Sequence, residues 1–304
     1  MLESKFLGID FENPLVIPSG IIPEIADSIK AQAAGAGGVV TKSITVSPRE
    51  GNPMPRVITY GFGILNSVGL RNPGLDKGIF LLKKLLLAAK IPVIVSIFAV
   101  SVADFKKLVA EVIKIQPKFI ELNLSCPNTT NELGESMGMG TESTYAAVSV
   151  AKKIVGNKTK LIAKLSPNVA KISEVAKAAE SAGADAISAI NTVGPGMVID
   201  IKTHQPKLGN KEGGVSGPGI RPVAIRCVYD IYESVNIPIL GMGGVETGKD
   251  AVEMLMAGAT LVGVGSAIYR HGFGVINKIK AEVTNYMRTK KIKSLAELVG
   301  VAHT

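Results

Sequence analysis

The sequence contains no tryptophan and few aromatic residues, which make up 5% of the chain. Proteins that bind single-stranded nucleic acid stack bases on aromatic side chains, and the lysines of this chain are spread along it rather than gathered into a stripe. The net charge of +9 therefore favours a modest basic field that attracts small anionic ligands, or plain solvated helix faces, over a nucleic-acid-binding surface.

Cysteine and histidine are also scarce, with two and three residues. His204, His271 and His303 lack the spacing of a metal site or of a Ser-His-Asp triad, so neither metal nor acyl-transfer chemistry is expected. Two cysteines are too few for a disulfide framework, and residues 1–5 lack the apolar core of a signal peptide. We expect an intracellular, cytoplasmic protein with reduced thiols.

No long apolar run is present either. The most apolar stretch, residues 79–100, is interrupted by Lys83, Lys84, Lys90 and Pro92, so no segment is predicted to cross a bilayer. Because the chain has neither a Pro/Ser-rich linker nor a short-period repeat, residues 1–304 are expected to form one domain. Apolar residues make up 46% of the sequence, enough for a sizeable core.

Short apolar runs alternate with amphipathic segments about every 25 to 35 residues, the pattern of βα units. The runs are rich in Val, Ile and Leu, as is typical of parallel strands covered on both faces. The eight predicted strands are residues 15–19, 38–43, 92–98, 119–125, 161–166, 186–192, 237–241 and 261–266. Helices are predicted at residues 102–115, 142–155, 172–182 and 247–257. The fold class is α/β, and the predicted architecture is a (β/α)8 TIM barrel.

Three segments do not fit this rhythm. Residues 6–13 are predicted to form a small hairpin that closes the barrel floor. Residues 44–74 and 196–214 form long insertions after the second and sixth strands, and the second of these has the alternation of a β segment. Long insertions at the strand ends of a barrel are usually functional.

The most informative segment is residues 121–128, ELNLSCPN, where an apolar run ends in a thiol between two carboxamides. The active site of a barrel enzyme lies at the carboxyl ends of the strands, so Cys126 is placed to meet a substrate. Pro127 stops the strand and would aim Cys126 and Asn128 into a pocket. A buried structural thiol is the alternative. Cys227 lies in a helical pattern and is expected in the core.

Glycines cluster at the ends of the last two predicted strands, at residues 241–244 and 263–266. In barrels a phosphate commonly binds to backbone N–H groups after strands 7 and 8. The clusters therefore favour a phosphate site, although plain tight turns would also use glycine.

Two lysines, Lys42 and Lys164, lie in strands that are otherwise apolar. Burial of an ammonium group is costly unless an anion or a cofactor dipole pairs with it. The pair therefore indicates a ligand, with an internal ion pair or a side chain that reaches the rim as the alternatives.

Together these motifs resemble the class 1 dihydroorotate dehydrogenases, flavin enzymes of pyrimidine synthesis. The matching segments follow one another in family order from about residue 7 to residue 267. They are residues 41–43, 66–70, 72–74, 123–128, 164–168, 190–192, 213–222, 241–244 and 263–266. Residues 48–53 and 200–206 are most similar to the branch that pairs with an electron-transfer subunit.

The resemblance implies a role for each matching residue. Cys126 would be the base that removes a proton from C5 of dihydroorotate while hydride leaves C6 for N5 of FMN, and Lys164 would stabilise negative charge on the reduced flavin. The residues that would bind the substrate are Lys42, Asn66, Gly69, Leu70, Asn123, Asn128, Asn191 and Thr192. Those that would bind FMN are Ser19, Lys42, Ser43, Ser96, Asn123, Lys164, Ile190, Gly217, Gly243, Gly244, Gly265 and Ser266.

Two features depart from the branch. Ser96 stands where the branch commonly has an asparagine near the flavin, and its hydroxyl has a shorter reach. Residues 129–140 are also unlike the branch, although their glycine and polar content permits a mobile lid.

The resemblance also implies partners. The chain has no cysteine cluster for an iron–sulfur centre, so a separate subunit carrying FAD and an iron–sulfur cluster would pass electrons to NAD, docked on a homodimer of this chain. A self-sufficient enzyme that uses fumarate or another small oxidant is the alternative. Neither nucleic acid nor a membrane is expected as a partner.

Three other functions remain open. A dihydropyrimidine dehydrogenase domain also has a cysteine after a similar strand, but Asn66 and Asn128 favour orotate. A tRNA dihydrouridine synthase would need a helical RNA-binding extension, and only residues 267–304 follow the eighth predicted strand. A non-catalytic scaffold subunit is disfavoured by the thiol and by both lysines.

Overall fold

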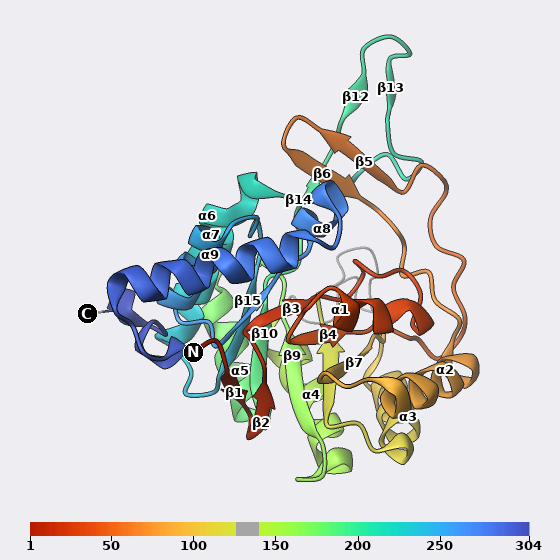
Figure 1. Cartoon of the computed structure of the whole chain (residues 1–304). Coiled ribbons are helices and arrows are strands. Elements are labelled where there is room, and N and C mark those ends of the chain that lie inside the picture. Colours follow the sequence, from red (N-terminus) through yellow and green to blue (C-terminus); the bar gives the residue numbers. More distant parts are fainter. Residues whose placement is uncertain (126–139, 304) are drawn as a thin grey trace.

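The computed structural model describes residues 1–125 and 140–303, and its centre is a closed barrel of eight parallel strands (Figure 1). Each of the eight predicted segments contributes one strand, which confirms the predicted (β/α)8 fold. In order around the barrel they are β3 (Leu15–Ile17), β4 (Gly38–Val40), β7 (Val93–Ile97), β8 (Phe119–Asn123), β9 (Lys160–Lys164), β10 (Ala186–Ala189), β15 (Ile239–Met242) and β16 (Leu261–Gly263).

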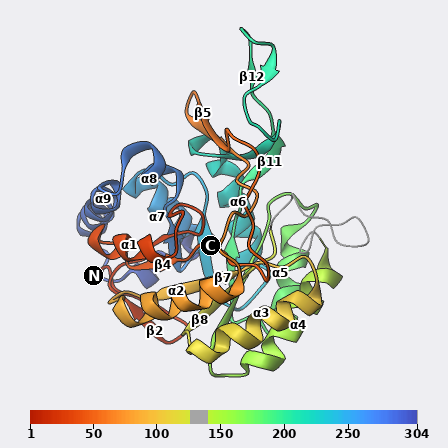
Figure 2. The same ribbon diagram turned by 90° about the vertical axis from the view of Figure 1, so that its right-hand side faces the viewer.

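Helices surround the barrel and pack apolar side chains against the strands (Figure 2). They are α1 (Lys30–Ala33), α2 (Leu75–Ala88), α3 (Val102–Val112), α4 (Thr141–Val155), α5 (Ile172–Ser181), α6 (Arg221–Tyr232), α7 (Gly248–Met256), α8 (Ser266–His271) and α9 (Val275–Lys290). The four predicted helices are confirmed, and residues 102–115 divide into α3 and the 3-10 turn η2 (Ile113–Ile115). Among the described residues, none of the helices has the length and apolar character needed to cross a membrane.

Helix α7 starts at a capping box that the sequence carries directly after the first glycine cluster. The Thr247 hydroxyl accepts a hydrogen bond from the Asp250 amide at 3.2 Å, and the Asp250 carboxylate accepts one from the Thr247 amide at 2.9 Å. Each bond satisfies an N–H that a helix start leaves without a partner. The turn that contains Gly243 and Gly244 therefore runs into a firmly anchored helix.

The floor of the barrel is closed by the predicted hairpin, which is formed by β1 (Ser4–Phe6) and β2 (Ile9–Phe11) and so starts two residues earlier than predicted. The rings of Phe6, Phe11 and Phe119 lie about 6 Å apart, with centroid separations of 6.1 to 6.2 Å. They join the inward apolar side chains of the strands in one buried cluster. This plug fills the amino-terminal end of the barrel and leaves the opposite end for polar groups.

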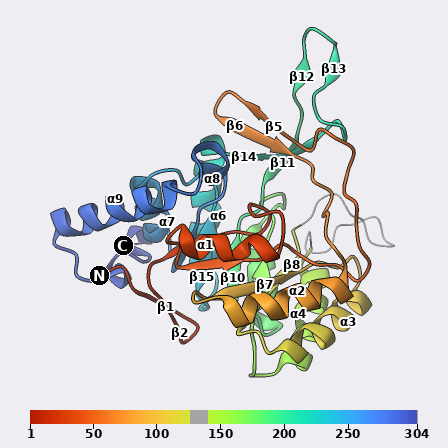
Figure 3. The same ribbon diagram turned by 45° about the vertical axis from the view of Figure 1, so that its right-hand side comes forward.

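The two long insertions meet over the carboxyl ends of the strands. β5 (Val57–Tyr60), β6 (Gly63–Asn66), β14 (Gly213–Ser216) and β11 (Val193–Gly196) form an antiparallel sheet in the order β11-β14-β6-β5. The predicted β segment in 196–214 is confirmed, and its hairpin of β12 (Ile199–Asp200) and β13 (Gln205–Pro206) projects beyond this sheet (Figure 3). That the insertions pair with each other, with Asn66 opposite Gly214, was not predicted.

Candidate active site

A cavity of about 720 Å3 lies between the carboxyl ends of the barrel strands and the antiparallel sheet of β5, β6, β14 and β11. Its walls come from segments that are far apart in the sequence. The predicted ligand residues that line it are Ser19, Lys42, Ser43, Asn66, Gly69, Leu70, Asn123, Lys164, Ile190, Asn191, Thr192, Gly243, Gly244, Gly265 and Ser266.

Four predicted site residues are not among the lining residues. Ser96 is completely buried behind Ser43, and Gly217 lies next to the lining residue Ser216. Cys126 and Asn128 lie outside the described residues, as does the predicted lid at 129–140 except for its last residue.

A chain of hydroxyl groups crosses one wall of the cavity. The Ser43 Oγ lies 3.3 Å from the Ser19 Oγ and 2.9 Å from the Ser96 Oγ. Asn123 donates an amide hydrogen bond to the Ser43 Oγ at 3.3 Å, and the Ser96 Oγ donates to Glu121 Oε1 at 3.1 Å. The hydroxyl of Ser96 therefore lies behind two side chains that line the cavity, Ser43 and Glu121, and does not itself line it.

Two of the predicted carboxamides hold the chain just before Cys126. Ser125 donates from its amide to Asn123 Oδ1 at 3.2 Å and from its hydroxyl to the same oxygen at 2.9 Å. Asn191 donates to the Ser125 carbonyl at 3.1 Å and to its hydroxyl at 2.8 Å. Because Ser125 is buried and held from β8 and from the end of β10, the backbone enters residue 126 from a fixed position.

The cavity edge near Asn66 has an unusual backbone. Leu70 has a φ of 57°, a conformation that costs free energy for a residue with a side chain. Gly69 before it has a φ of 72°, and a Cβ there would lie 2.6 Å from the Asn52 amide nitrogen. Backbone strain of this kind is concentrated at ligand sites, which supports the predicted role of residues 66–70.

The first glycine cluster forms a tightly packed turn at the cavity wall that leaves no space for a side chain. Gly244 has a φ of 72°, and a Cβ there would lie 2.7 Å from the Arg221 Cβ and 2.9 Å from the Gly217 carbonyl oxygen. Gly217 thus contributes to the site by packing against Gly244. Backbone N–H groups exposed in such a turn are suited to bind a phosphate.

The charges around the cavity favour anionic ligands. The charged side chains among its described lining residues are Lys42, Arg56, Arg71, Lys164 and a single carboxylate, Glu121. Burial lowers the pKa of Lys164, and the nearby Glu121 carboxylate partly offsets this effect. Within the described part of the chain, no group of three or more His, Cys, Asp or Glu side chains is placed to hold a metal ion.

The sequence reasoning missed several lining residues, above all Glu121, Met242 and Arg56. A usable signal existed for Glu121, because it lies two residues before Asn123 in an apolar strand and so must point to the same side of the sheet. Met242 lies within the first glycine cluster and was assigned no role, but its Sδ lies 3.2 Å from the Lys164 Nζ. No comparable pattern marks Arg56, which reaches the cavity from an irregular loop.

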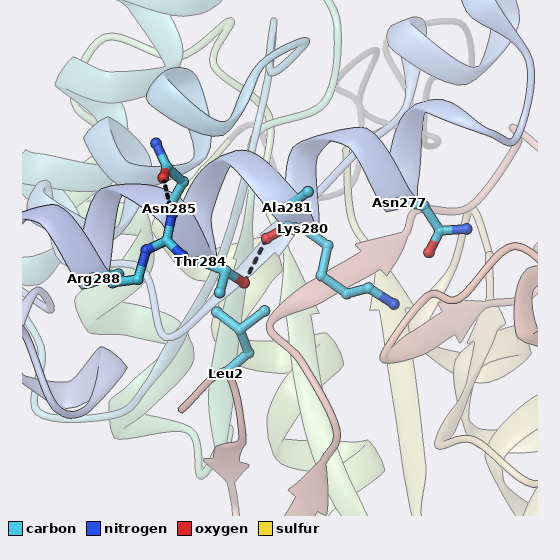
Figure 4. Close-up of a pocket in the computed structure, with 7 residues that line it drawn as sticks. All are labelled: Leu2, Asn277, Lys280, Ala281, Thr284, Asn285 and Arg288. Carbon is cyan, nitrogen blue, oxygen red and sulfur yellow. Dashed lines mark hydrogen bonds between the residues drawn. The ribbon is translucent and has the colours of Figure 1, made fainter.

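A second, shallower hollow of about 350 Å3 runs along α9 on the outside of the barrel (Figure 4). It is lined by Leu2, Asn277, Lys280, Ala281, Thr284, Asn285 and Arg288. The polar bonds shown there join residues of α9 itself, from Arg288 to Asn285 and from Thr284 to the Lys280 carbonyl. We assign no function to this hollow.

Residues 1–287 match the family model described as dihydroorotate dehydrogenase. This chain belongs to that family. The predicted family is thereby confirmed, and the match extends across the barrel and both insertions.

Individual relatives are similar over their whole length. A protein of Methanothermobacter thermautotrophicus is 42% identical over 304 residues, which cover 100% of this chain and 99% of the relative. One of Pyrococcus abyssi is 41% identical over 303 residues, 99% of each chain. Both are named dihydroorotate dehydrogenase B (NAD(+)), catalytic subunit, the branch that the sequence motifs predicted.

A solved structure of the dihydroorotate dehydrogenase of Eimeria tenella, in complex with ferulenol, superposes with a TM-score of 0.85. It covers 99% of this chain and 88% of the other, at 24% identity. The likeness supports the barrel fold alone.

The second cysteine provides a test of the buried environment around the barrel. Cys227 lies in α6, and burial, assisted by Asp230, raises its pKa to about 11. Because the thiolate is the reactive form, a Cys126→Ala variant should react slowly with a thiol reagent at pH 7.5. As the pH is raised toward that pKa, the rate should increase roughly tenfold for each pH unit, because the thiolate fraction does.

Unfolding in urea should make the same thiol react at once, and a Cys126→Ala, Cys227→Ser variant should not react in either state. Complete labelling of the folded Cys126→Ala protein within seconds at pH 7.5 would contradict the assignment of Cys227 to the core.

Proposed function

We propose that this chain oxidises (S)-dihydroorotate to orotate in the de novo synthesis of UMP, with FMN as the hydride acceptor. The observation that carries the proposal is the single cavity that gathers both predicted lysines, three predicted carboxamides and the glycines of both clusters in a member of this family. The excess of cationic side chains suits a flavin phosphate and a substrate carboxylate.

The residues present fit FMN. Gly243 and Gly244 line the cavity, and the close packing of Arg221 and Gly217 against Gly244 holds this turn at the cavity wall, where backbone N–H groups would be the donors for a phosphate. The bound flavin would supply a hydride acceptor at its N5. Lys164, buried at the base of the cavity, would place a positive charge beside the ring and stabilise negative charge there.

The substrate would be held by groups that can both donate and accept. Asn66, Asn123 and Asn191 each offer an amide and a carbonyl oxygen, the pattern that the imide edges of orotate require. Lys42 would bind the carboxylate, together with residues 69 and 70 and Thr192. Asn128 would complete the site from the loop after β8.

Cys126 would act as the general base at C5 of dihydroorotate. The backbone directly before it is fixed by two hydrogen bonds: the Ser125 amide donates to Asn123 Oδ1, and Asn191 donates to the Ser125 carbonyl. A base of this kind needs a fixed position relative to the proton it removes.

Replacement of Cys126 by alanine should slow reduction of the flavin by dihydroorotate by roughly 10²- to 10⁴-fold, because the general base is lost. FMN should remain bound. Stopped-flow absorbance under anaerobic conditions, in a single turnover, measures the rate.

The matched control is Cys227→Ser, which removes the other thiol from the far side of the strands and should reduce at the normal rate. Near-normal reduction of the Cys126→Ala flavin would defeat the assignment of the base.

Replacement of Gly244 by valine should lower FMN occupancy at least roughly tenfold, because a side chain at a φ of 72° is strained and would clash with Arg221 and Gly217, which displaces the turn from the cavity wall. The ratio of flavin to protein absorbance in the purified chain gives the occupancy. Gly219→Val is the control, because a Cβ at Gly219 would have no heavy atom within 4 Å. Equal occupancy in the two variants would argue against a phosphate site at this turn.

The electron acceptor is proposed to be a separate subunit. The relatives named above are catalytic subunits of an NAD(+) enzyme, and the sequence has no cysteine cluster for an iron–sulfur centre. In this proposal residues 1–304 form one domain of a cytoplasmic enzyme, two copies make a homodimer core, and the partner carries FAD and an iron–sulfur cluster.

The isolated chain should therefore oxidise dihydroorotate with artificial dyes but reduce NAD poorly, and addition of the partner purified with it from the native source should restore NAD reduction. Steady-state assays with each acceptor, with and without the partner, provide the measurement. Rapid turnover of the chain alone with fumarate or NAD would refute the partner model.

A further inference from the structure

Four consecutive strands place a polar side chain inside the barrel, beneath the cavity. They are Ser96 on β7, Glu121 on β8, Lys164 on β9 and Ser188 on β10, each no more than 6% exposed. Ser96 lies opposite Glu121 in the strand register, and Lys164 lies opposite Ser188. The inward residues one step below, such as Ile94, Phe119 and Ile162, belong to the apolar floor. The polar layer therefore rests directly on hydrocarbon.

Glu121 has an incomplete set of partners in this layer. Its Oε1 accepts from the Ser96 hydroxyl at 3.1 Å, whereas its Oε2 has no hydrogen-bond partner among the described residues. A buried carboxylate with one hydrogen bond is costly unless a cation compensates its charge. The side chain lines the cavity, and it is the one acid among the charged groups of the described lining.

Lys164 is the cation on the strand next to Glu121. It lies opposite Asn123 in the strand register and is therefore the diagonal neighbour of Glu121 on the same face. It is 6% exposed, and its Nζ contacts the sulfur of Met242. The strand on its other side contributes Ser188 at the matching register, whose hydroxyl also has no partner among the described residues. The other titratable or cationic side chains of the described lining are Lys42, Arg56, Arg71 and Tyr269. Glu121 is thus the group able to compensate Lys164.

We propose that Glu121 is a positioning residue for Lys164: its buried carboxylate, oriented by the Ser96 hydroxyl, supplies the counter-charge that keeps the ammonium charged and directed into the cavity. Glu121 does not touch the reacting atoms and acts through Lys164. The role of this pair toward FMN rests on the proposed function, whereas the pairing itself is a property of the folded chain.

The sign of the pH dependence follows from burial. Burial lowers the pKa of Lys164 in the folded chain, so the unfolded chain binds this proton at a higher pH. Stability therefore falls as the pH decreases from the unfolded pKa to the folded pKa, and the loss is complete below the folded pKa. Glu121 opposes this loss. Without the carboxylate the pKa of Lys164 falls further, and the folded chain loses more stability at pH 6 than at pH 9.

The first experiment uses the flavin-free chain and four proteins: the native sequence, Glu121→Gln, Lys164→Met and the double variant. Urea unfolding is followed by circular dichroism at pH 6 and pH 9. Glu121→Gln should lower the urea midpoint more at pH 6 than at pH 9. In the Lys164→Met chain, Glu121→Gln should lower the urea midpoint equally at pH 6 and pH 9, because the coupling requires both partners. If Glu121→Gln lowers the urea midpoint equally at both pH values in the chain that retains Lys164, the proposal is overturned.

The second experiment measures the FMN dissociation constant of each protein by fluorescence titration. Glu121→Gln should weaken FMN binding at pH 9 at least roughly tenfold relative to pH 6, because one unit of pKa is a factor of ten in the charged fraction. Glu121→Asp retains the charge and should keep the native, flat profile. A weakening that is the same at both pH values would indicate a merely structural role and overturn the proposal.

Two outcomes separate this inference from the proposed function. If the native chain binds no FMN, the proposed function fails, and the urea experiment still decides whether Glu121 and Lys164 are coupled. If Glu121→Gln does not fold, Glu121→Ala takes its place in the same comparison with and without Lys164→Met, and a loss of urea midpoint that is equal at both pH values with Lys164 present would refute the pairing.

Discussion

Closure of eight parallel strands into a barrel is the constraint on which the rest of this structure depends. Side chains alternate between the two faces of a strand, so closure sends every second residue into a space that must be filled. On β8 this places Phe119, Glu121 and Asn123 in three successive levels, from the aromatic floor to the cavity. Along this one strand the inward side chains change from hydrocarbon packing to polar groups that line the cavity.

The hairpin β1–β2 makes this division possible. Its phenylalanines fill the amino-terminal end together with Phe119, and the interior near the floor contains hydrocarbon side chains. Charges held above such a layer are poorly screened, so each interaction among them is stronger than in water and each uncompensated charge is more costly. Lys164 is therefore an effective electrostatic group for a ligand only if its own charge is sustained by a neighbour.

The insertions supply the remaining walls. Residues 44–74 and 196–214 pair through β6 and β14, so the sheet that covers the strand ends joins two insertions that are distant in the sequence. The strained residues next to Asn66 are held by the same segment, through Asn52 and Arg49. The assembly of the cavity walls therefore depends on a pairing that neither insertion specifies alone.

Local patterns in the sequence were sufficient to predict the barrel, its strand segments, the floor hairpin and the family, because strand periodicity and short motifs are properties of neighbouring residues. The family motifs also marked most residues that line the cavity. The tertiary structure alone decided that Ser96 lies behind Ser43 rather than in the cavity, that Arg56 reaches it, and that Glu121 shares a buried layer with Lys164. These relations depend on the register between strands and on the pairing of distant insertions, and a single sequence contains no local signal for either.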